Sequence, residues 1–397
     1  MPSVKEKIRN SLPYRLYRNT AIFIVRLFPV KKNKVVFDNF GGKGFGDDPK
    51  YIALSLLKNY PGEFKLYWFT KDMKTPLAEG IVPVKYGTIK AAYHMATAKV
   101  WVDNIKSSFK IKKKKNQFYI QTWHSTLGLK KNEAQVSNLP EKYVKEAKRD
   151  AAMTDLMYSN NDFRYEIYKN HFWYTGKVIK CSVPRNSVIM ERNEELINNI
   201  KEKYGIRKEQ ALLLYAPTFR KEKNKENISF DYYKVCNAIG HKFGTECVCM
   251  VRLHPNDTTR YPDMVLPEGV VNVSDYPDMQ ELLAACDYLI TDYSAVMFDF
   301  SFAKKPVFLL MKDYEEYLKK ERELQFTMEE IPFCRALTEE ELLQVIENYS
   351  ENKYQEKCNL FFERIGLSEN GDGAKVIAGI IYESSKGLFG KLHSDFN

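Results

Sequence analysis

The sequence predicts an α/β protein with two doubly wound domains that face each other across a central cleft. Three observations lead to this prediction. The chain has 397 residues, more than one ordinary hydrophobic core accommodates. Short apolar runs alternate with helical patterns, as in parallel sheets that are covered on both faces. Residues 89–104 and 279–293 also repeat one order, in which a helix, a strand and a polar strand tip follow each other.

Apolar runs of strand length define the two expected sheets. In the first half they occupy residues 35–40, 64–70, 100–104, 118–123 and 156–160, with helices expected at 49–58, 88–98 and 140–152. In the second half they occupy 212–217, 247–255, 288–293 and 307–311, with helices expected at 192–204, 231–243, 278–286 and 295–303. The resulting division is an N-terminal segment at 1–33, a first domain at 34–186, a second domain at 187–375 and a C-terminal helix with a tail at 376–397. We expect this last helix to pack back on one of the domains.

The N-terminal segment is basic and amphipathic. Residues 1–34 contain nine Lys and Arg against one acid, Glu6, with apolar and aromatic residues between them. Such a pattern is typical of a helix that lies on an anionic membrane surface. A second basic block at residues 110–115 is expected to add to that surface. The alternative is a solvated charge run on an ordinary packed helix; nucleic acid is not indicated, because no nucleic-acid-binding motif accompanies the charge.

The composition is that of a folded protein without a membrane span. Hydrophobic residues make up 44% and aromatic residues 14% of the chain, and no window supplies the ~20 apolar residues of a transmembrane helix. The N-terminus lacks the long apolar stretch of a signal peptide. The seven cysteines form no C-x-x-C pair. This odd, unpatterned count favours the reducing cytoplasm.

Polar side chains gather directly after the predicted strands. Because ligands of such sheets bind at the carboxyl ends of the strands, these tips are the candidate site. In the first half they are Gly41 to Asp47, Asn104, His124, Ser125 and Thr126. In the second half they are Pro217, Thr218, Phe219, Arg220, Arg252, His254 and Thr291 to Ser294.

The stretch DYLITDYSAVMFDFSFAKKPVFLL at residues 287–310 has a polar cluster between a buried strand and a helix. Ser294 at this junction suits a helix N-cap. It also suits an anion site, since helix N-termini carry unpaired N–H groups and a positive dipole end. On this segment alone the helix cap is the favoured interpretation.

Several common nucleotide motifs are missing. The loop Gly42-Lys43-Gly44-Phe45-Gly46 lacks the spacing of a dinucleotide fingerprint and the Gly-Lys-Ser/Thr of a P-loop, although it could approach a phosphate or glycan closely. No Asp-x-Asp occurs, so the usual carboxylate clamp for a metal-bound diphosphate is absent. A diphosphate would instead need arginine, histidine and helix N-termini. We therefore expect no metal and no cofactor.

Six motifs in order resemble the CDP-glycerol glycerophosphotransferase family, which builds teichoic acids and related capsule polymers. They are Trp123-His124 with Lys130-Lys131, Tyr215 to Arg220, Arg252 to Pro255, and Leu289 to Ser294 with Phe298-Asp299-Phe300, supported by Gly41 to Gly44 with Asp48 to Tyr51 and by Pro184 to Asn186. The resemblance covers roughly residues 35 to 380.

The resemblance implies a GT-B-like pair of Rossmann-like domains, the first for the acceptor and the second for the donor. It also implies peripheral attachment to the cytoplasmic face of the membrane and metal-independent transfer. The reaction passes a polyol phosphate from a CDP-polyol to a hydroxyl of a lipid-linked glycan or polymer acceptor and releases CMP. A homo-oligomer is possible.

The site residues follow from the same resemblance. His124 corresponds to the general base, and Arg252 with His254 to the diphosphate-binding pair, His254 being counted as catalytic too. Further donor contacts are expected at Ser125, Thr126, Arg185, Pro217, Thr218, Ser294, Ala295 and Asp299. The acceptor side is expected at Gly42, Lys43, Gly44 and Asp48. A histidine base suits the chemistry, since its ordinary pKa of ~6.5 lies close to cytoplasmic pH.

The chain departs from the family pattern at Ser125, where glycine is common, and at Ala295, where a second serine is common. Thr126 to Leu129 also differ from the usual Thr-Pro form. These changes indicate either another polyol or acceptor, or neutral drift. The alternatives to a CDP-glycerol enzyme are a CDP-ribitol transferase, a nucleotide-sugar glycosyltransferase of GT-B type, and a non-catalytic scaffold on the membrane.

Overall fold

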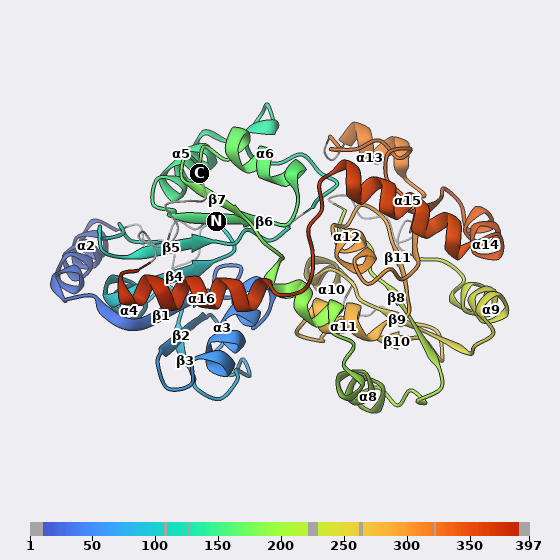
Figure 1. The fold of residues 1–397 in the computed structure, drawn as a ribbon, viewed down its shortest axis with the longest axis horizontal. Coiled ribbons are helices and arrows are strands. Elements are labelled where there is room, and N and C mark those ends of the chain that lie inside the picture. The colour runs from blue at the N-terminus through green and yellow to red at the C-terminus, as the bar shows by residue number, and fades with distance from the viewer. Residues whose placement is uncertain are drawn as a thin grey trace.

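The computed structural model describes residues 11–106, 109–125, 127–220, 229–261, 265–320 and 323–388. They form two α/β domains that lie side by side (Figure 1). The first sheet has the strand order β3-β2-β1-β4-β5-β6-β7 and the second β10-β9-β8-β11-β12-β13. Every neighbouring pair of named strands is parallel. The predicted GT-B-like class of two doubly wound Rossmann-like domains is confirmed.

The strands of the first sheet are β1 (Lys31–Asp38), β2 (Lys65–Thr70), β3 (Ile81–Lys85), β4 (Ala98–Asp103), β5 (Phe118–Gln121), β6 (Leu156–Ser159) and β7 (Lys177–Lys180). Those of the second are β8 (Ala211–Tyr215), β9 (Cys247–Val251), β10 (Val271–Asn272), β11 (Tyr288–Thr291), β12 (Val307–Leu310) and β13 (Cys334–Ala336). The sequence predicted the central strands but missed β3, β7, β10 and β13.

The helices of the first domain are α2 (Leu12–Leu27), α3 (Asp47–Asn59), α4 (Ile89–Thr97), α5 (Glu141–Ala151) and α6 (Asp162–His171), with the 3-10 turns η1 (Glu133–Gln135) and η2 (Pro184–Asn186). Those that follow are α7 (Ser187–Met190), α8 (Glu194–Lys203), α9 (Tyr232–Phe243), α10 (Pro255–Arg260), α11 (Met279–Ala285), α12 (Val296–Ser301), α13 (Tyr314–Lys320), α14 (Glu339–Glu347), α15 (Glu351–Arg364) and α16 (Gly373–Lys386).

The first sheet has a separate core on each face. Alternate side chains of β1 point to opposite faces, so Val35 and Phe37 join one core while Val36 joins the other. Helices α3 and α16 pack together on the first face. Helix α16 contributes Ile377 and Ile381 there, so the C-terminal helix returns to the first domain, as Figure 1 shows in red beside α3. On the other face α4 covers the sheet and α2 packs outside it through Val25.

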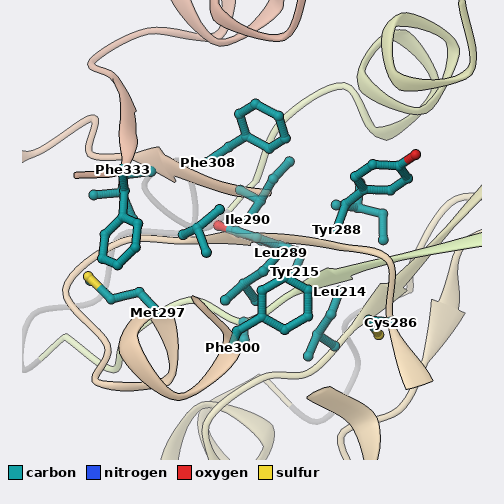
Figure 2. Close-up of a cluster of buried hydrophobic side chains, with 14 of the residues drawn as sticks. Leu214, Tyr215, Cys286, Tyr288, Leu289, Ile290, Met297, Phe300, Phe308 and Phe333 are labelled. Atoms are coloured by element: carbon teal, nitrogen blue, oxygen red, sulfur yellow. The ribbon is translucent and has the colours of Figure 1, made fainter. Parts of the chain in front are cut away.

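The second domain has one large core around its central strand β11. Leu289 and Ile290 on this strand are fully buried and lie among Leu214, Met297, Phe300 and Phe308 (Figure 2). All four residues of β11 are buried, which explains its continuous apolar sequence. This packing fixes the strand end from which Thr291 to Ser294 leave the sheet.

The first lysine of the second basic block does not lie on the surface as predicted, whereas Lys112 and Lys115 are exposed. Lys110 is 5% exposed, and its Nζ lies 2.6 Å from Asp150 Oδ1 and 3.0 Å from Asp103 Oδ2. Lys113 pairs with Asp155. A buried ammonium must be paired because its desolvation is costly. The prediction was therefore wrong for Lys110, whose charge belongs to the interior of the first domain.

Candidate active site

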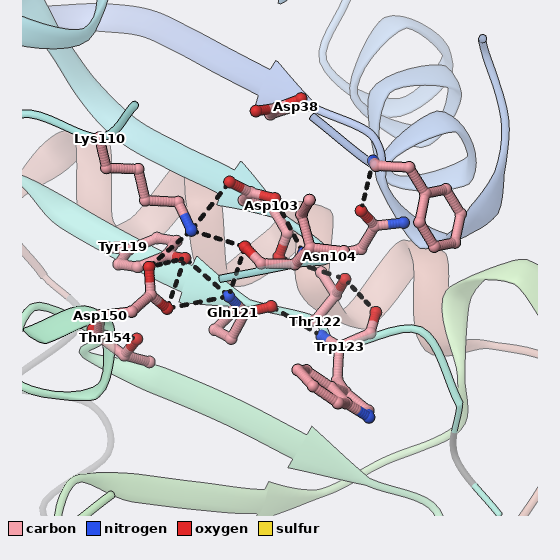
Figure 3. Close-up of polar contacts among 12 residues, drawn as sticks. Asp38, Asp103, Asn104, Lys110, Tyr119, Gln121, Thr122, Trp123, Asp150 and Thr154 are labelled. Atoms are coloured by element: carbon pink, nitrogen blue, oxygen red, sulfur yellow. Dashed lines mark hydrogen bonds and ion pairs between the residues drawn. The ribbon is translucent and has the colours of Figure 1, made fainter. Parts of the chain in front are cut away.

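The candidate base His124 follows the end of β5 on a sharp turn. Trp123, immediately before it, has a φ of +58°, a left-handed conformation that costs a non-glycine residue free energy. Its N–H donates to Gln121 Oε1 at 3.0 Å, and Thr122 N–H continues the ladder to Asp103 O at 2.9 Å. These bonds, shown in Figure 3, determine where the polypeptide places His124.

A buried polar network supports this turn from below. Gln121 Nε2 donates to Asp150 Oδ2 at 3.1 Å, and Lys110 holds the other oxygen of the same carboxylate (Figure 3). Tyr119 donates to Asp150 as well. Satisfied buried polar groups of this kind specify one conformation, since any rearrangement leaves a charge unpaired. The turn before His124 is thus rigidly defined by residues that sequence reasoning did not assign to the site.

The imidazole of His124 is oriented by a main-chain carbonyl. Its Nδ1 lies 3.0 Å from Asn104 O. A carbonyl can only accept, so Nδ1 carries the proton and Nε2 is left with its lone pair. The rings of Trp123 and Phe40 contact the imidazole at centroid distances of 4.2 and 5.6 Å. This tautomer is the one that a general base using Nε2 requires.

The surroundings keep His124 neutral near pH 7. Burial lowers the pKa of His124 below its ordinary value, and the positive charges of Arg185 and Arg164 lower it further. The Asn104 carbonyl and the carboxylate of Asp47 act in the opposite direction and raise it. Burial is the largest of these effects because it disfavours the charged imidazolium.

The segment after His124 enters the second domain. Leu127 and Leu129 are fully buried in the core of that domain. Gln325 N–H donates to Leu129 O at 2.6 Å, and Lys130 forms an antiparallel bridge with Leu324. The candidate base is therefore tied to both domains. Ser125 follows it and is partly buried; Thr126 lies outside the described residues.

The tip of β8 in the second domain is organised by an ion pair. Arg220 contacts Asp292 and Asp313 at 2.8 and 2.6 Å, and Asp292 also accepts from Thr218 N–H at 2.9 Å. Pro217, just before, is buried. These contacts hold the loop after β8 against the loop after β11 and thereby place Thr218.

Two buried polar atoms at these tips lack a hydrogen-bond partner among the residues that the structure describes. They are Thr218 Oγ1 and Arg252 Nη1. Burial of such an atom without a partner costs roughly 1–3 kcal/mol, more for a charged group. Burial also lowers the pKa of Arg252. Both atoms are therefore suited to receive a polar group of a ligand.

Two lysines of the first domain lie near His254 of the second. Lys43 and Lys130 of the first domain lie near enough to lower the pKa of His254, which burial also lowers and to a greater extent. Arg252 precedes His254 by two residues, and the ring of Phe219 contacts the imidazole at a centroid distance of 5.4 Å. This set could bind a polyanion such as a diphosphate.

The predicted helix cap at Ser294 is wrong. Helix α12 begins at Val296 with Ala295 as its N-cap, and no side-chain hydrogen bond caps it. A main-chain hydrogen bond closes the first turn instead, since Ser294 O accepts from Met297 N–H at 3.3 Å. The hydroxyl of Ser294 makes no hydrogen bond to any residue that is described, and the side chain is partly buried.

Arg185 and Asp299, predicted as donor contacts, bind each other. Arg185 Nε donates to Asp299 Oδ2 at 3.0 Å, and Arg185 Nη1 lies 2.9 Å from Asp47 Oδ1. Arg185 and Asp299 are each 4% exposed, and Asp299 also accepts from Gln280. These contacts join the two domains, which gives both residues a role that needs no ligand.

The predicted acceptor-side residues lie in and after the loop that follows β1. Gly42 has a φ of +81°, and a Cβ there would lie 2.8 Å from Tyr86 Cβ, so packing alone requires glycine. Gly44, at φ +67°, faces open space. Asp48 is 1% exposed and accepts from Tyr158 and from Arg185 N–H; burial raises its pKa to about 8. Lys43 is exposed, and its charge lowers the pKa of His254 in the second domain.

A cavity of about 670 Å³ lies elsewhere, between α9 and the β9–β10 edge of the second domain, and its lining includes Tyr232, Cys236 and Cys249. None of the strand-tip residues above lines it. Within the described ranges, no group of three or more His, Cys, Asp or Glu side chains is placed to hold a metal ion.

Residues 20–383 match the family described as CDP-Glycerol:Poly(glycerophosphate) glycerophosphotransferase. The chain is 30% identical over 392 residues to the teichoic acid poly(glycerol phosphate) polymerase of Bacillus subtilis strain 168, covering 95% of this chain and 52% of that one. It spans a similar 51% of the polymerase of Staphylococcus epidermidis. The chain thus has about half the length of these two relatives. It covers 96% of a third polymerase, from Bacillus spizizenii, at 29% identity.

The fold matches a solved polymerase structure. The wall teichoic acid polymerase TagF superposes with a TM-score of 0.82 at 28% identity, covering 96% of this chain and 98% of that one. A histidine variant of TagF soaked with CDPG gives the same TM-score at 27% identity, with 95% and 96% covered.

The pKa of His124 is expected to lie below the ordinary ~6.5 of histidine, because burial disfavours the imidazolium. His124 should stay neutral as the pH falls from 7 through 6.5 and take up its proton only below that. The titration of its ring C–H resonances by NMR measures this, with His124→Asn for assignment and the urea-unfolded chain as the reference. A native pKa at or above the unfolded one contradicts the prediction.

Proposed function

Because the chain belongs to the CDP-glycerol:poly(glycerophosphate) glycerophosphotransferase family, we propose that it transfers glycerol phosphate from CDP-glycerol to a hydroxyl group of a lipid-linked teichoic acid or capsule polymer. The observation that carries the proposal is the combination of a neutral, oriented His124 with the cationic side chains of Lys43 and Lys130 near His254 of the second domain. His124 suits an incoming hydroxyl, and the cationic side chains suit a diphosphate.

In the proposed reaction the acceptor oxygen attacks the phosphorus that bears glycerol. A new P–O bond forms, the bond to the bridging oxygen of the diphosphate breaks, and CMP leaves. The hydroxyl proton passes to His124 Nε2, the nitrogen that the Asn104 carbonyl leaves unprotonated. A positioned base of this kind contributes typically 100-fold or more.

We assign binding of the negatively charged diphosphate to the cations Arg252, Lys43 and Lys130, with His254, whose pKa is lowered, as a hydrogen-bonding partner beside them. Fixed cations stabilise phosphoryl oxygens in the transition state at no cost in reorganisation. Thr218 Oγ1 and the Ser294 hydroxyl are available for hydrogen bonds to the same donor. This assignment needs no metal ion, and we propose that none takes part.

Replacement of His124 tests the proposal. His124→Ala should lower CMP release from CDP-glycerol at least 100-fold, because the hydroxyl loses its base. CDP-glycerol and CDP-ribitol are compared as donors, with membrane extract as the acceptor source, since a teichoic acid poly(ribitol-phosphate) polymerase is also a relative, at 25% identity. Activity above a tenth of wild type, with the fold intact by circular dichroism, overturns the base assignment. A preference for CDP-ribitol overturns the assignment of CDP-glycerol as the donor substrate.

Thr218→Val tests the donor contact separately. The substitution removes a buried hydroxyl that has no protein partner among the described residues and keeps the shape of the side chain. The thermal midpoint should therefore be unchanged or higher, while the KM for CDP-glycerol rises about tenfold, the value of a hydrogen bond to a charged group. Thr327→Val, at an exposed position, is the control and should change neither. An unchanged KM in Thr218→Val contradicts the contact.

Attachment to the membrane surface is assigned to helix α2. Leu12, Leu16, Phe23 and Leu27 recur at helical spacing, and their exposed fractions are between 59% and 69%. The opposite side of the helix packs on α4 through Val25. An apolar stripe this exposed marks an interaction surface, and the basic residues of the N-terminal segment suit anionic lipid. In the described ranges, no helix is both long and apolar enough to cross a bilayer.

The double substitution Phe23→Ser with Leu27→Ser removes half of this stripe without touching the packed side of α2. We expect at least a tenfold loss of co-sedimentation with vesicles of phosphatidylglycerol and phosphatidylcholine, since each buried apolar side chain contributes about 1.5–3 kcal/mol. Leu360→Ser is the matched control, because Leu360 is 62% exposed on α15. Equal sedimentation of the double variant and the control refutes the assignment.

A further inference from the structure

A continuous path of hydrogen bonds and ion pairs joins the second domain to the candidate base. Asp299 binds Arg185 at 3.0 Å, and Arg185 Nη1 binds Asp47 Oδ1 at 2.9 Å. Asp47 Oδ2 then accepts from Asn104 Nδ2 at 2.8 Å, and the main-chain carbonyl of Asn104 holds His124 Nδ1 at 3.0 Å. Each link is within hydrogen-bond distance, so a displacement of one member is transmitted to the next.

Asp47 is the branching point of this path. Both of its carboxylate oxygens are engaged, one by Arg185 and the other by Asn104. Its backbone is in the left-handed region, with φ +56° at the first residue of α3. Asp and Asn tolerate that conformation better than other residues with a side chain. The side chain of Asn104 is held further by Asn39 and by Phe40 N–H, both at 2.8 Å.

Asp47 is also the acidic side chain that offsets the positive charges around His124. Arg185 and Arg164 oppose protonation of the imidazole and Asp47 favours it. The ring lies in tilted contact with Phe40 and Trp123. The ammonium of Lys106 lies over the Trp123 ring and is paired with Glu133 at 2.6 Å. A change of charge at Asp47 should therefore change the proton affinity of His124 directly.

We propose that Asp47 is a positioning residue for the base: through Asn104 it fixes the carbonyl that orients His124, and through Arg185 it ties that orientation to Asp299 of the second domain. The inference rests on the proposed function, because it takes His124 as the base of the transfer. Asp299 of the second domain and the base His124 are then aligned by one path of ion pairs and hydrogen bonds rather than independently.

The test is Asp47→Asn, which removes the charge and keeps both the shape and the tolerance of a positive φ. We expect the kcat for CMP release to fall at least tenfold, since small misplacement of a catalytic group has effects of that size, while the KM for CDP-glycerol stays within about twofold. The acidic limb of the pH profile of kcat/KM should move to lower pH, because the carboxylate that favoured the imidazolium is gone. The NMR titration of His124 should move in the same direction without any substrate.

Lys50→Gln is the control for a merely structural effect. Lys50 lies one turn further along α3 and also pairs across the domains, with Asp278 at 2.6 Å, but it makes no contact with Asn104 or His124 that is described. It should lower the thermal midpoint and leave the acidic limb in place. Asn104→Ala, which keeps the carbonyl but loses the tie to Asp47, should lower kcat as Asp47→Asn does.

An unmoved NMR titration of His124 in Asp47→Asn overturns the inference whatever the activity, and so does a kcat within twofold of wild type. A lower thermal midpoint in Asp47→Asn with an unmoved acidic limb also overturns it, since the role is then structural. The NMR readout needs no turnover. A wild-type protein that releases no CMP thus refutes the proposed function and leaves the coupling of Asp47 to His124 to be judged by the titration.

Discussion

The arrangement of the whole molecule depends on one buried guanidinium. Arg185 lies in the turn between the two domains, is 4% exposed, and binds Asp47 of the first domain and Asp299 of the second. A charge this buried costs several kcal/mol if it loses its partners. The ion pair is complete only when both domains are in place. It therefore acts against any relative position of the domains in which one carboxylate has moved away.

Other contacts across the domains are consistent with this constraint. Lys50 pairs with Asp278 and Glu281, and helix α16 returns after the second domain to pack on α3. The segment after His124 buries Leu127 and Leu129 in the core of the second domain. Because these contacts join the domains at separate places, the strand ends that carry His124 and Arg252 have little freedom to move relative to each other.

The sequence predicted the central strands of both sheets and missed their edges. Strand β11 is buried at all four positions and is a continuous apolar run. Strand β3 alternates between buried and exposed positions, and β7 is largely unburied. The four strands that were missed, β3, β7, β10 and β13, are the outermost strands of their sheets. An edge strand has a neighbour on one side only and needs less apolar sequence, so it is harder to distinguish from a loop.

The candidate site was predictable where a residue follows a buried strand, since the end of a parallel strand points to one edge of the sheet. His124, Thr218 and Arg252 were predicted in that way to follow strands, and they follow β5, β8 and β9. The partners of Arg185 could not be found, because pairing with Asp47 and Asp299 depends on how the two domains meet, which no local pattern encodes. The cap at Ser294 was wrongly predicted for a smaller reason: α12 starts two residues later, and its first turn is closed by a main-chain bond to Ser294 O.

The backbone around His124 adopts unfavourable conformations, which indicates that this region holds side chains in position at a cost in stability. Phe40, Asp47 and Trp123 all have φ between +45° and +58°, and a left-handed non-glycine residue costs of order 1–3 kcal/mol. Each is held by a polar bond to the ends of β4 and β5: Phe40 N–H by Asn104 Oδ1, Asp47 by Asn104 Nδ2 and Trp123 N–H by Gln121 Oε1. Strain at three neighbouring positions persists only where the surroundings over-determine it. Phe40 and Trp123 contact the ring of His124, and the charge of Asp47 acts on it. The strained conformations are therefore best explained by the need to fix one imidazole.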